Sequence, residues 1–194
     1  NYTTFKSYYE IQKSVENDPA FDSNKAQKAL KAYVERQQQT IDVKAEIMLD
    51  HFISNIFAKK RLKGHAKAMI VTQNIEMAIR YYQAINRLLE QKGNPFKAMI
   101  AFSGEKIVDG IGYTESQING FEDSKTKEKF DSDDYRILVV ANKYLTGFDQ
   151  PKLTAMYVDK KLRDVLAVQT LSRLNRSANK YDKKNRRFVC VGLF

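Results

Sequence analysis

Three polar side chains near the carboxyl end of the chain share one helical face. At about 100° per residue, Gln169, Arg173 and Arg176 fall within an arc of about 60°. The helix is predicted to begin at Asp164, which suits an N-cap, and to end near Asn175. Its opposite face is apolar and can dock on a sheet, through Ala167, Leu171, Leu174 and Ala178. The helix would present two guanidinium forks, which pair with phosphates and carboxylates, although arginines on a helix are more often solvated charges.

A polar turn ahead of this helix supports a functional role for it. Residues 137–141 are β-branched or small and apolar, which is typical of a strand buried on both faces. The next ten residues, 142–151, contain Thr146, Gly147, Asp149 and Pro151 and cannot continue a strand. A second short apolar run covers 155–158. The sequence therefore predicts two buried strands joined by a turn, with the arginine helix after them.

These segments resemble two motifs of superfamily 2 helicases and translocases. Residues 137–151, ILVVANKYLTGFDQP, resemble motif V, and residues 169–176, QTLSRLNR, resemble motif VI. Ser172 stands where many relatives have glycine. The succession GFDQPKL, YVDK and QTLSRLNR is most similar to the restriction (R) subunit of type I restriction-modification enzymes, the ATP-driven DNA translocase and nuclease subunit.

The resemblance implies an α/β fold of the RecA-like kind, with a parallel sheet between helical layers. In such motors ATP lies between two lobes, and the first lobe holds the phosphates and Mg²⁺. The chain contains no G-x-x-x-x-G-K-[ST] loop, so it is interpreted as the second lobe and is expected not to hydrolyse ATP alone. The resemblance assigns catalysis to Gln169, Arg173 and Arg176, and nucleotide binding to Gly147, Asp149 and the two arginines.

On the nucleic-acid side, the resemblance implies contacts between strand ends and the DNA backbone. The residues expected to make them are Thr72, Ser103, Gly104, Tyr144 and Thr146. The expected partners are double-stranded DNA, a first motor lobe and a nuclease domain of the same polypeptide, and the modification and specificity subunits. The expected location is the cytoplasm.

Composition is compatible with such a protein. The chain has 194 residues, 43% of them hydrophobic, and a net charge of +10, which points to a polyanionic partner. It begins with Asn1 rather than methionine, which suggests a piece of a longer polypeptide. No run of 18 apolar residues is present, so no membrane span is expected. The single cysteine, Cys190, lies in a strand-like run at 188–191 and is interpreted as a core residue.

Two segments are predicted from the change of pattern along the chain. Residues 1–62 show only helical patterns and are predicted to form a linker or subdomain. The third helix of this segment is expected to begin at Thr40 and to end in the basic cluster 59–63, with Gly64 beyond it. Residues 63–194 alternate strand and helix and are predicted to form the lobe.

Within the lobe, strands are predicted at 68–71 and 96–102. The helix between them is predicted to have one apolar face, formed by Ile75, Ala78, Tyr82, Ile85 and Leu89. Residues 104–116 are predicted to be a loop, and 115–130 a helix interrupted at Gly120. Because loops after parallel strands form the ligand edge of a sheet, Thr72 and Ser103 are expected to share an edge with Thr146 and Asp149.

Some alternatives remain open on the sequence alone. His51 and His65 lack partners at metal-ligand spacing, and an aspartate cluster at 131–134 is interpreted as a solvated turn rather than a cation site. The lysine surplus also fits a basic nucleic-acid or subunit-docking module with no role in ATP hydrolysis. The helicase motifs do not exclude the second lobe of an RNA helicase.

Overall fold

The computed structural model describes residues 37–145, 147–161, 168–169, 172 and 189–192. The chain divides into two compact units, Asn1–Lys44 and Ala45–Phe194. In the first unit, only the opening of helix α3 (Gln38–Phe52) is described. Residues 45–62 fall in the same unit as the sheet, whereas the sequence assigned them to the helical segment. Since 1–36 lie outside the described residues, the predicted division at 62 stays a prediction.

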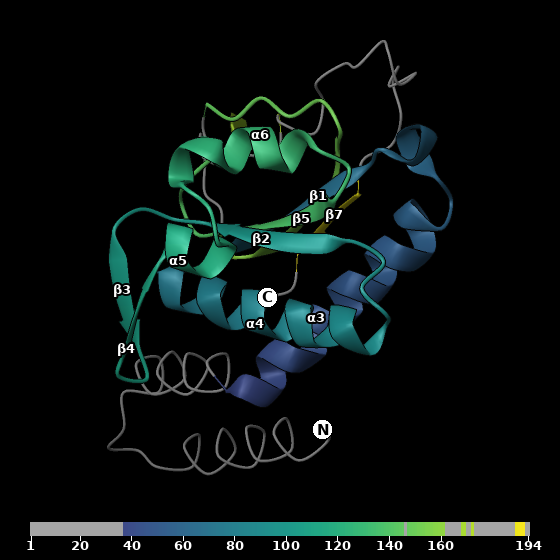
Figure 1. The fold of residues 1–194 in the computed structure, drawn as a ribbon. Coiled ribbons are helices and arrows are strands. Elements are labelled where there is room, and N and C mark those ends of the chain that lie inside the picture. The colour runs from purple at the N-terminus through teal and green to yellow at the C-terminus, as the bar shows by residue number, and fades with distance from the viewer. Residues whose placement is uncertain (1–36, 146, 162–167, 170–171, 173–188, 193–194) are drawn as a thin grey trace, which may run out of the picture. The chain divides into compact units, whose positions relative to one another are not determined.

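A five-stranded parallel sheet is the centre of the second unit (Figure 1). Its strands are β1 (Lys67–Thr72), β2 (Lys97–Ala101), β5 (Tyr135–Val140), β6 (Leu153–Asp159) and β7 (Val189–Gly192). They lie in the order β2-β5-β1-β6-β7. Every residue of β1 and β6 is buried, as expected for strands covered on both faces. The strands predicted from apolar runs are confirmed, including the run that contains Cys190.

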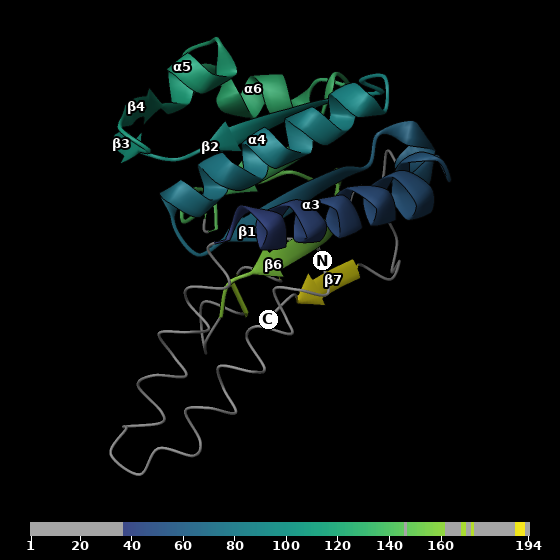
Figure 2. The same cartoon turned by 90° about the horizontal axis from the view of Figure 1, so that it is seen from below.

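Helices cover both faces of this sheet (Figures 1 and 2). Helix α4 (Ile75–Gln91) and the part of α3 from Ala45 onward lie on one face. Helix α6 (Thr126–Asp131) lies on the other, where Phe130 packs into a core with Met69, Leu138 and Phe148. The predicted RecA-like α/β fold class is therefore confirmed. No helix within the described residues is long and apolar enough to cross a membrane.

Helix α4 follows from its local sequence. The side chain of Asn74 accepts a hydrogen bond from the Met77 backbone N at 2.9 Å, which caps the first turn. Gly93, with φ of +76°, follows the last turn, where a left-handed backbone is needed. The predicted face included Tyr82, but Tyr81 is the fully buried tyrosine, and its hydroxyl donates to Asp159. A one-residue shift occurred because adjacent tyrosines look alike in a hydrophobic pattern.

The loop prediction for 104–116 is wrong, because this segment forms a β-hairpin. Strands β3 (Glu105–Val108) and β4 (Ile111–Thr114) pair antiparallel, with Val108 opposite Ile111. The two residues between them, Asp109 and Gly110, both have positive φ, which matches the twist of a tight hairpin. Asp-Gly is a strong hairpin signal, so the sequence contained the evidence.

The predicted third helix also ends earlier than expected. Helix α3 begins at Gln38, so Thr40 lies inside it rather than at its cap. After Phe52 the chain forms a π-helical turn, Ile53–Phe57, and then a 3-10 turn, Arg61–Gly64. Lys60, Leu62 and Lys63 have positive φ, so the basic cluster is not an α-helical terminus. The side chain of Leu62 is buried, whereas Lys60 and Lys63 are not among the buried residues.

The predicted interruption at Gly120 is confirmed. Helix α5 (Glu115–Asn119) begins with a capping box in which Thr114 and Gln117 bond each other's backbone. It ends at Gly120, whose φ is +74°. A 3-10 turn, Asp123–Lys125, then leads into α6. This break lets α5 lie beside β2 while α6 covers the sheet.

Candidate nucleic-acid interface at the carboxyl edge of the sheet

The carboxyl ends of four strands meet at one edge of the sheet. Val140 of β5 lies opposite both Val71 of β1 and Ala101 of β2, and Thr72 lies opposite Asp159 of β6. The segments that follow these strands, 73–74, 103–104, 141–145 and 160–161, therefore share that edge. We call them the carboxyl edge, and they are where ligands bind in open parallel sheets.

Ser103 and Gly104 are exposed at the carboxyl edge, as predicted. Gly104 has φ of +78°, and no heavy atom would lie within 4 Å of a Cβ added there. The glycine is therefore required by the backbone conformation and not by crowding within the described protein. The arrangement leaves a hydroxyl and backbone groups accessible to a ligand.

Thr72 occupies the predicted edge, but its hydroxyl is not presented to solvent. The side chain is fully buried, and Oγ1 lies 3.0 Å from the Asn74 carbonyl oxygen and 3.1 Å from that of Val140. A hydroxyl has a single proton to donate, so these carbonyls share it. In this conformation Thr72 joins β1 to β5 and to the start of α4.

Tyr144 is half-buried at the carboxyl edge and adopts φ of +68°. Its ring stacks on Phe148 with centroids 4.7 Å apart, and the Nζ atoms of Lys143 and Lys127 lie 5.5 and 5.7 Å from the ring centroid. Burial raises the pKa of Tyr144, so its hydroxyl keeps its proton. Positive φ is uncommon for a bulky residue and concentrates at functional sites.

A buried carboxylate that the sequence did not single out fixes the loops of this edge. Glu115 is 1% exposed and accepts from the Phe102 backbone N at 2.7 Å, Thr126 Oγ1 at 2.6 Å and Lys143 Nζ at 2.9 Å. Burial alone would lower the pKa of Lys143, but the hydrogen bond and charge of Glu115 outweigh it and raise that pKa. The segments that carry Ser103 and Tyr144 are thereby tied, together with α6, to one carboxylate.

Lys160 adds a second cation that sequence analysis missed. It follows β6, and its Nζ lies 2.5 Å from Asn142 Oδ1 and 3.5 Å from the Ala141 carbonyl oxygen. Burial lowers the pKa of Lys160. The chain has 33 lysines and arginines, so no local pattern separates Lys160 from the others. Lys160 reaches the carboxyl edge only because β6 lies beside β1 in the folded sheet.

Gly147 and Asp149 are exposed, and Gly147 has φ of +70°. The next residue, Gln150, lies 3.4 Å from Asp131 and accepts from the Lys152 backbone N, both of which lie near the amino ends of the strands. The chain has therefore crossed from one edge of the sheet to the other by Gln150. Asp149 adjoins the amino edge, which corrects the expectation that it shares the edge of Ser103.

The motif VI residues are only partly described. Gln169 is exposed, and its carbonyl oxygen accepts from Ser172 Oγ at 2.9 Å. Arg173, Arg176 and Thr146 lie outside the described residues, as does the predicted cap Asp164. Their roles therefore stay predictions.

Cations are buried at the opposite, amino edge of the sheet. Lys67 is fully buried, and its Nζ donates to the carbonyl oxygens of Ser132 at 2.6 Å and Tyr135 at 2.5 Å. Burial, and then the charges of Arg136 and Lys152, lower the pKa of Lys67 to about 7. Among the described lysines, Lys67 has the most strongly shifted pKa. Its hydrogen bond to Ser132 also ties β1 to the turn before β5.

The aspartates of that turn pair with cations of the protein. Asp133 Oδ1 lies 2.8 Å from His65 Nδ1 and 3.2 Å from Arg136 Nη1. Asp131 Oδ1 lies 3.0 Å from Lys152 Nζ. The other histidine, His51, lies 2.8 Å from the Tyr157 hydroxyl. Over the described ranges, no group of three or more His, Cys, Asp and Glu could hold a metal ion.

We expect Lys67→Met to change how stability depends on pH. Because the folded-state pKa lies near 7 and the ordinary value near 10.5, the unfolded chain binds more protons between these values. The contribution of Lys67 to the free energy of unfolding therefore rises with pH in this window, by about 2 kcal/mol from pH 7.5 to 9.5. Urea unfolding of both proteins at these two pH values measures it. A wild-type minus variant difference that does not increase with pH would contradict the prediction.

The matching family model and the curated relatives are all described as type I restriction enzyme subunits. The family described as type I restriction enzyme subunit R domain 3 matches residues 106–190. The MjaIXP endonuclease subunit of Methanocaldococcus jannaschii is 28% identical over 86% of this chain and 16% of its own length. A type I restriction enzyme endonuclease subunit of Staphylococcus aureus is 28% identical over 77% of this chain and 20% of its own length. The chain thus spans about a fifth or less of these relatives.

A further curated relative and one solved structure are also similar to this chain. The HindI endonuclease subunit of Haemophilus influenzae is 25% identical over 87% of the chain and 16% of its own length. Among solved structures, the C-terminal part of the Fun30 ATPase domain aligns with a TM-score of 0.46 and 12% identity, over 96% of this chain and 59% of that one. The resemblance carried by the sequence motifs is confirmed by the family match and the relatives, and the chain is related to the R subunits of type I restriction enzymes.

Proposed function

We propose that the chain is the second motor lobe of an ATP-driven translocase of double-stranded DNA in a type I restriction enzyme. The carboxyl edge is the observation that carries this proposal. It presents a hydroxyl at Ser103, backbone groups at Gly104 and a cation at Lys160 within one edge of the sheet, next to Lys143, whose charge is paired with Glu115. Such groups contact phosphates and position a strand without selecting a base sequence.

The start of α4 adds to this edge. Its 17 residues begin directly after the carboxyl end of β1, so the positive end of its dipole lies beside the cations. The side chain of Asn74 caps one backbone N–H there and Glu76 offsets part of the positive end. The helix therefore supports phosphate binding without accounting for it alone.

The ATP-binding site would be completed from this lobe by the residues of motif V and motif VI. We assign Arg173 and Arg176 to the γ-phosphate, because a planar, permanently charged fork suits a developing phosphoryl charge. Gln169 would link the lobe interface to the nucleotide, and Gly147 with Asp149 would lie near the ribose. The phosphate loop and the Mg²⁺ ligands would come from a first lobe.

Movement of DNA would follow from two states of the lobe pair. ATP bound between the lobes favours a closed state, and hydrolysis removes the contacts that favour it. If each lobe grips the phosphate backbone more tightly in one state than in the other, alternation of the two states advances the duplex. The gripping groups of this lobe would be those of the carboxyl edge, held in place by Glu115.

We expect Lys160→Gln to weaken binding of a duplex about threefold to tenfold in low salt and to reduce the salt slope by about one unit. The matched control is Lys59→Gln. Lys59 also bonds an asparagine, with Nζ 3.0 Å from Asn55 Oδ1, but it precedes β1 and so lies away from the carboxyl edge. Fluorescence anisotropy with labelled duplex at several salt concentrations measures both.

Two outcomes would contradict the proposed edge. Equal losses in the two lysine variants would show binding by overall charge, as a basic docking module requires. A preference of more than about tenfold for one duplex sequence, which corresponds to about 1.4 kcal/mol, would show base recognition instead of backbone contact.

A further inference from the structure

The outer side of β2 is only partly closed. Strand β2 ends the sheet, so one of its sides has no neighbouring strand among those described. The Lys97 backbone N donates to the Asp134 carbonyl at 2.7 Å on the β5 side, and backbone groups alternate sides along a strand. The register with β5 shifts between Lys97 and Ala98, but the N–H and C=O of Ile100 bond Asn119 on the outer side, and Ala98, two residues earlier, points the same way. Any closure of this edge must come from side chains or from another chain.

At one position of this edge, the side-chain amide of Asn119 forms the two backbone hydrogen bonds that a neighbouring strand would form. Its Oδ1 accepts from the Ile100 backbone N at 3.1 Å, and its Nδ2 donates to the Ile100 carbonyl at 2.8 Å. Two residues further on, Glu115 accepts from the Phe102 backbone N. Among the described residues, no hydrogen bond to the outward groups of Ala98 is found. The edge is thus capped at its carboxyl half and open at its amino half.

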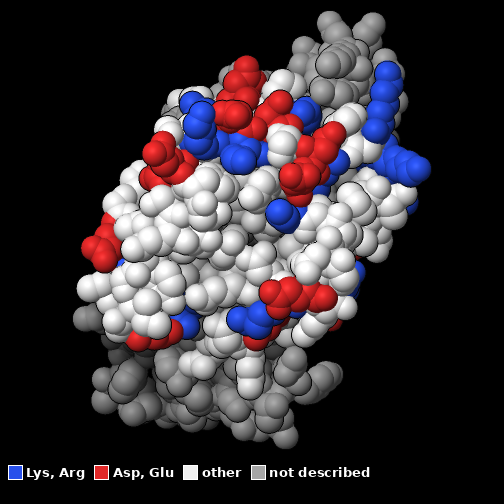
Figure 3. All heavy atoms as spheres, in the orientation of Figure 1, with Lys and Arg blue, Asp and Glu red and all other residues white. Residues whose placement is uncertain are grey.

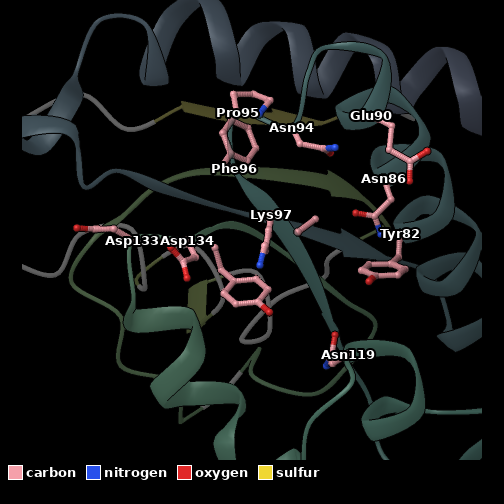
Figure 4. Close-up of a pocket in the computed structure, with 12 residues that line it drawn as sticks. Tyr82, Asn86, Glu90, Asn94, Pro95, Phe96, Lys97, Asn119, Asp133 and Asp134 are labelled. Atoms are coloured by element: carbon pink, nitrogen blue, oxygen red, sulfur yellow. The ribbon is translucent and has the colours of Figure 1, made fainter.

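A groove of about 630 Å³ lies at this open half. Figure 4 shows side chains of α4, including Asn86 and Glu90, on one side of β2, and Asp133 with Asp134 on the other. Ala98 lines the groove between these walls. An added strand would occupy the space between the two helical layers, and its side chains would alternate between the two walls.

The groove is acidic in a basic chain. Three carboxylates line it, those of Glu90, Asp133 and Asp134, against one cation, Lys97. Asp133 is already paired with cations of the protein, whereas Glu90 and Asp134 form no ion pair within the described residues. In Figure 3, acidic and basic side chains both border the mostly uncharged surface between α6 and α4, so the acidity is that of the residues that line the groove. The net charge of the whole chain is +10, so this acidity is local.

We propose that the groove binds an extended, basic segment of a partner protein, which adds a strand to the open edge of β2 at Ala98. Main-chain hydrogen bonds would supply affinity, and the carboxylates of Glu90 and Asp134 would select lysine or arginine side chains. Nucleic acid is disfavoured at this place because its phosphates would meet three carboxylates. The inference does not rest on the proposed motor function, since the groove flanks β2 and not the carboxyl edge.

Synthetic peptides test the chemistry directly. The probe is an acetylated, amidated heptapeptide of alternating threonine and arginine, and its counterpart carries glutamate in place of arginine. A third peptide keeps the arginines but has its five central backbone nitrogens methylated, which removes donors without changing the charge. We expect the first peptide to bind the protein at least tenfold more tightly than either of the others, by isothermal titration calorimetry.

Hydrogen exchange separates strand addition from simple charge attraction. At saturation with the basic peptide, the Ala98 amide should exchange at least tenfold more slowly, because its N–H becomes bonded. Binding that leaves Ala98 exchange unchanged would overturn the proposal, as would equal affinity for the methylated peptide. Absence of binding up to millimolar peptide would also overturn it.

Paired variants test the selection of basic side chains. Glu90→Gln combined with Asp134→Asn should weaken binding of the basic peptide at least tenfold. The matched control, Glu46→Gln combined with Glu128→Gln, removes two exposed carboxylates that do not line the groove. Equal losses in the two double variants would mean that overall charge, and not the groove, attracts the peptide.

Discussion

Arg176→Ala is expected to lower DNA-stimulated ATP turnover by about 10³-fold or more in a complete R subunit that carries this chain. Arginine fingers contribute about 10³ to 10⁵ in kcat in well-studied GTPases, because they stabilise charge that develops on the transferred phosphoryl group. Translocation should be lost with it, since movement depends on hydrolysis. Phosphate release with and without duplex DNA gives the measurement.

Two further variants test whether the effect depends on the planar guanidinium group of Arg176. Arg176→Lys keeps the charge but loses the paired donors, so it should also be severely impaired. Arg187→Ala removes an arginine outside motif VI and should keep most of the turnover. A lysine variant as active as wild type would show that charge alone suffices and would contradict an arginine finger.

The largest expected effect on stability is at Glu115. Glu115→Ala leaves the Phe102 backbone N and Thr126 Oγ1 without their partner and leaves Lys143 without its closest carboxylate. Removal of one member of a buried ion pair costs about 3 to 5 kcal/mol in general, so we expect a loss of about 3 kcal/mol. For a chain of this length that lowers Tm by roughly 6 to 12 °C. Urea and thermal unfolding measure both quantities.

Two controls accompany this prediction. Glu128→Ala removes an exposed glutamate whose carboxylate lies 3.3 Å from Lys125, and exposed pairs contribute about 0 to 1 kcal/mol. Glu115→Gln keeps the shape and one acceptor, so its loss should fall between those of the two alanine variants. If Glu115→Ala is no more damaging than Glu128→Ala, Glu115 does not hold the loops of the carboxyl edge.

The strands were predictable because burial on both faces leaves a visible pattern. Runs such as 137–141 contain only apolar residues, which is typical of parallel strands covered on both faces. The break at Gly120 was predictable for a similar reason, since a left-handed residue ends α5. The hairpin at 105–114 was missed although Asp109 and Gly110 carried the signal, because several glycines in one short segment are also typical of a loop.

The supporting residues of the site could not be predicted in the same way. Glu115 opens a helix with polar neighbours, and nothing local shows that it is buried. Its burial depends on the Phe102 backbone, Thr126 and Lys143 arriving from three other segments. Lys160 likewise gains its position from β6 lying beside β1. Long-range arrangement of this kind leaves no periodic trace in a single sequence.

Placement of Asp149 shows the limit of reasoning from strand ends. A loop between parallel strands must return from the carboxyl edge to the amino edge, so only its first residues stay at the edge where it began. Tyr144 lies in that first part and Asp149 in the last. The sequence could show that the turn was polar but not where along it the return took place.

The double variant Arg173→Ala, Arg176→Ala in the complete R subunit tests the motor assignment most directly. Steady-state ATP turnover with duplex DNA is the measurement, and thermal melting of the same sample confirms that the variant is folded. The account predicts a folded protein in which DNA-stimulated turnover has fallen by about 10³-fold or more. Near-normal turnover in a stably folded double variant would contradict it and would favour a basic docking module in its place.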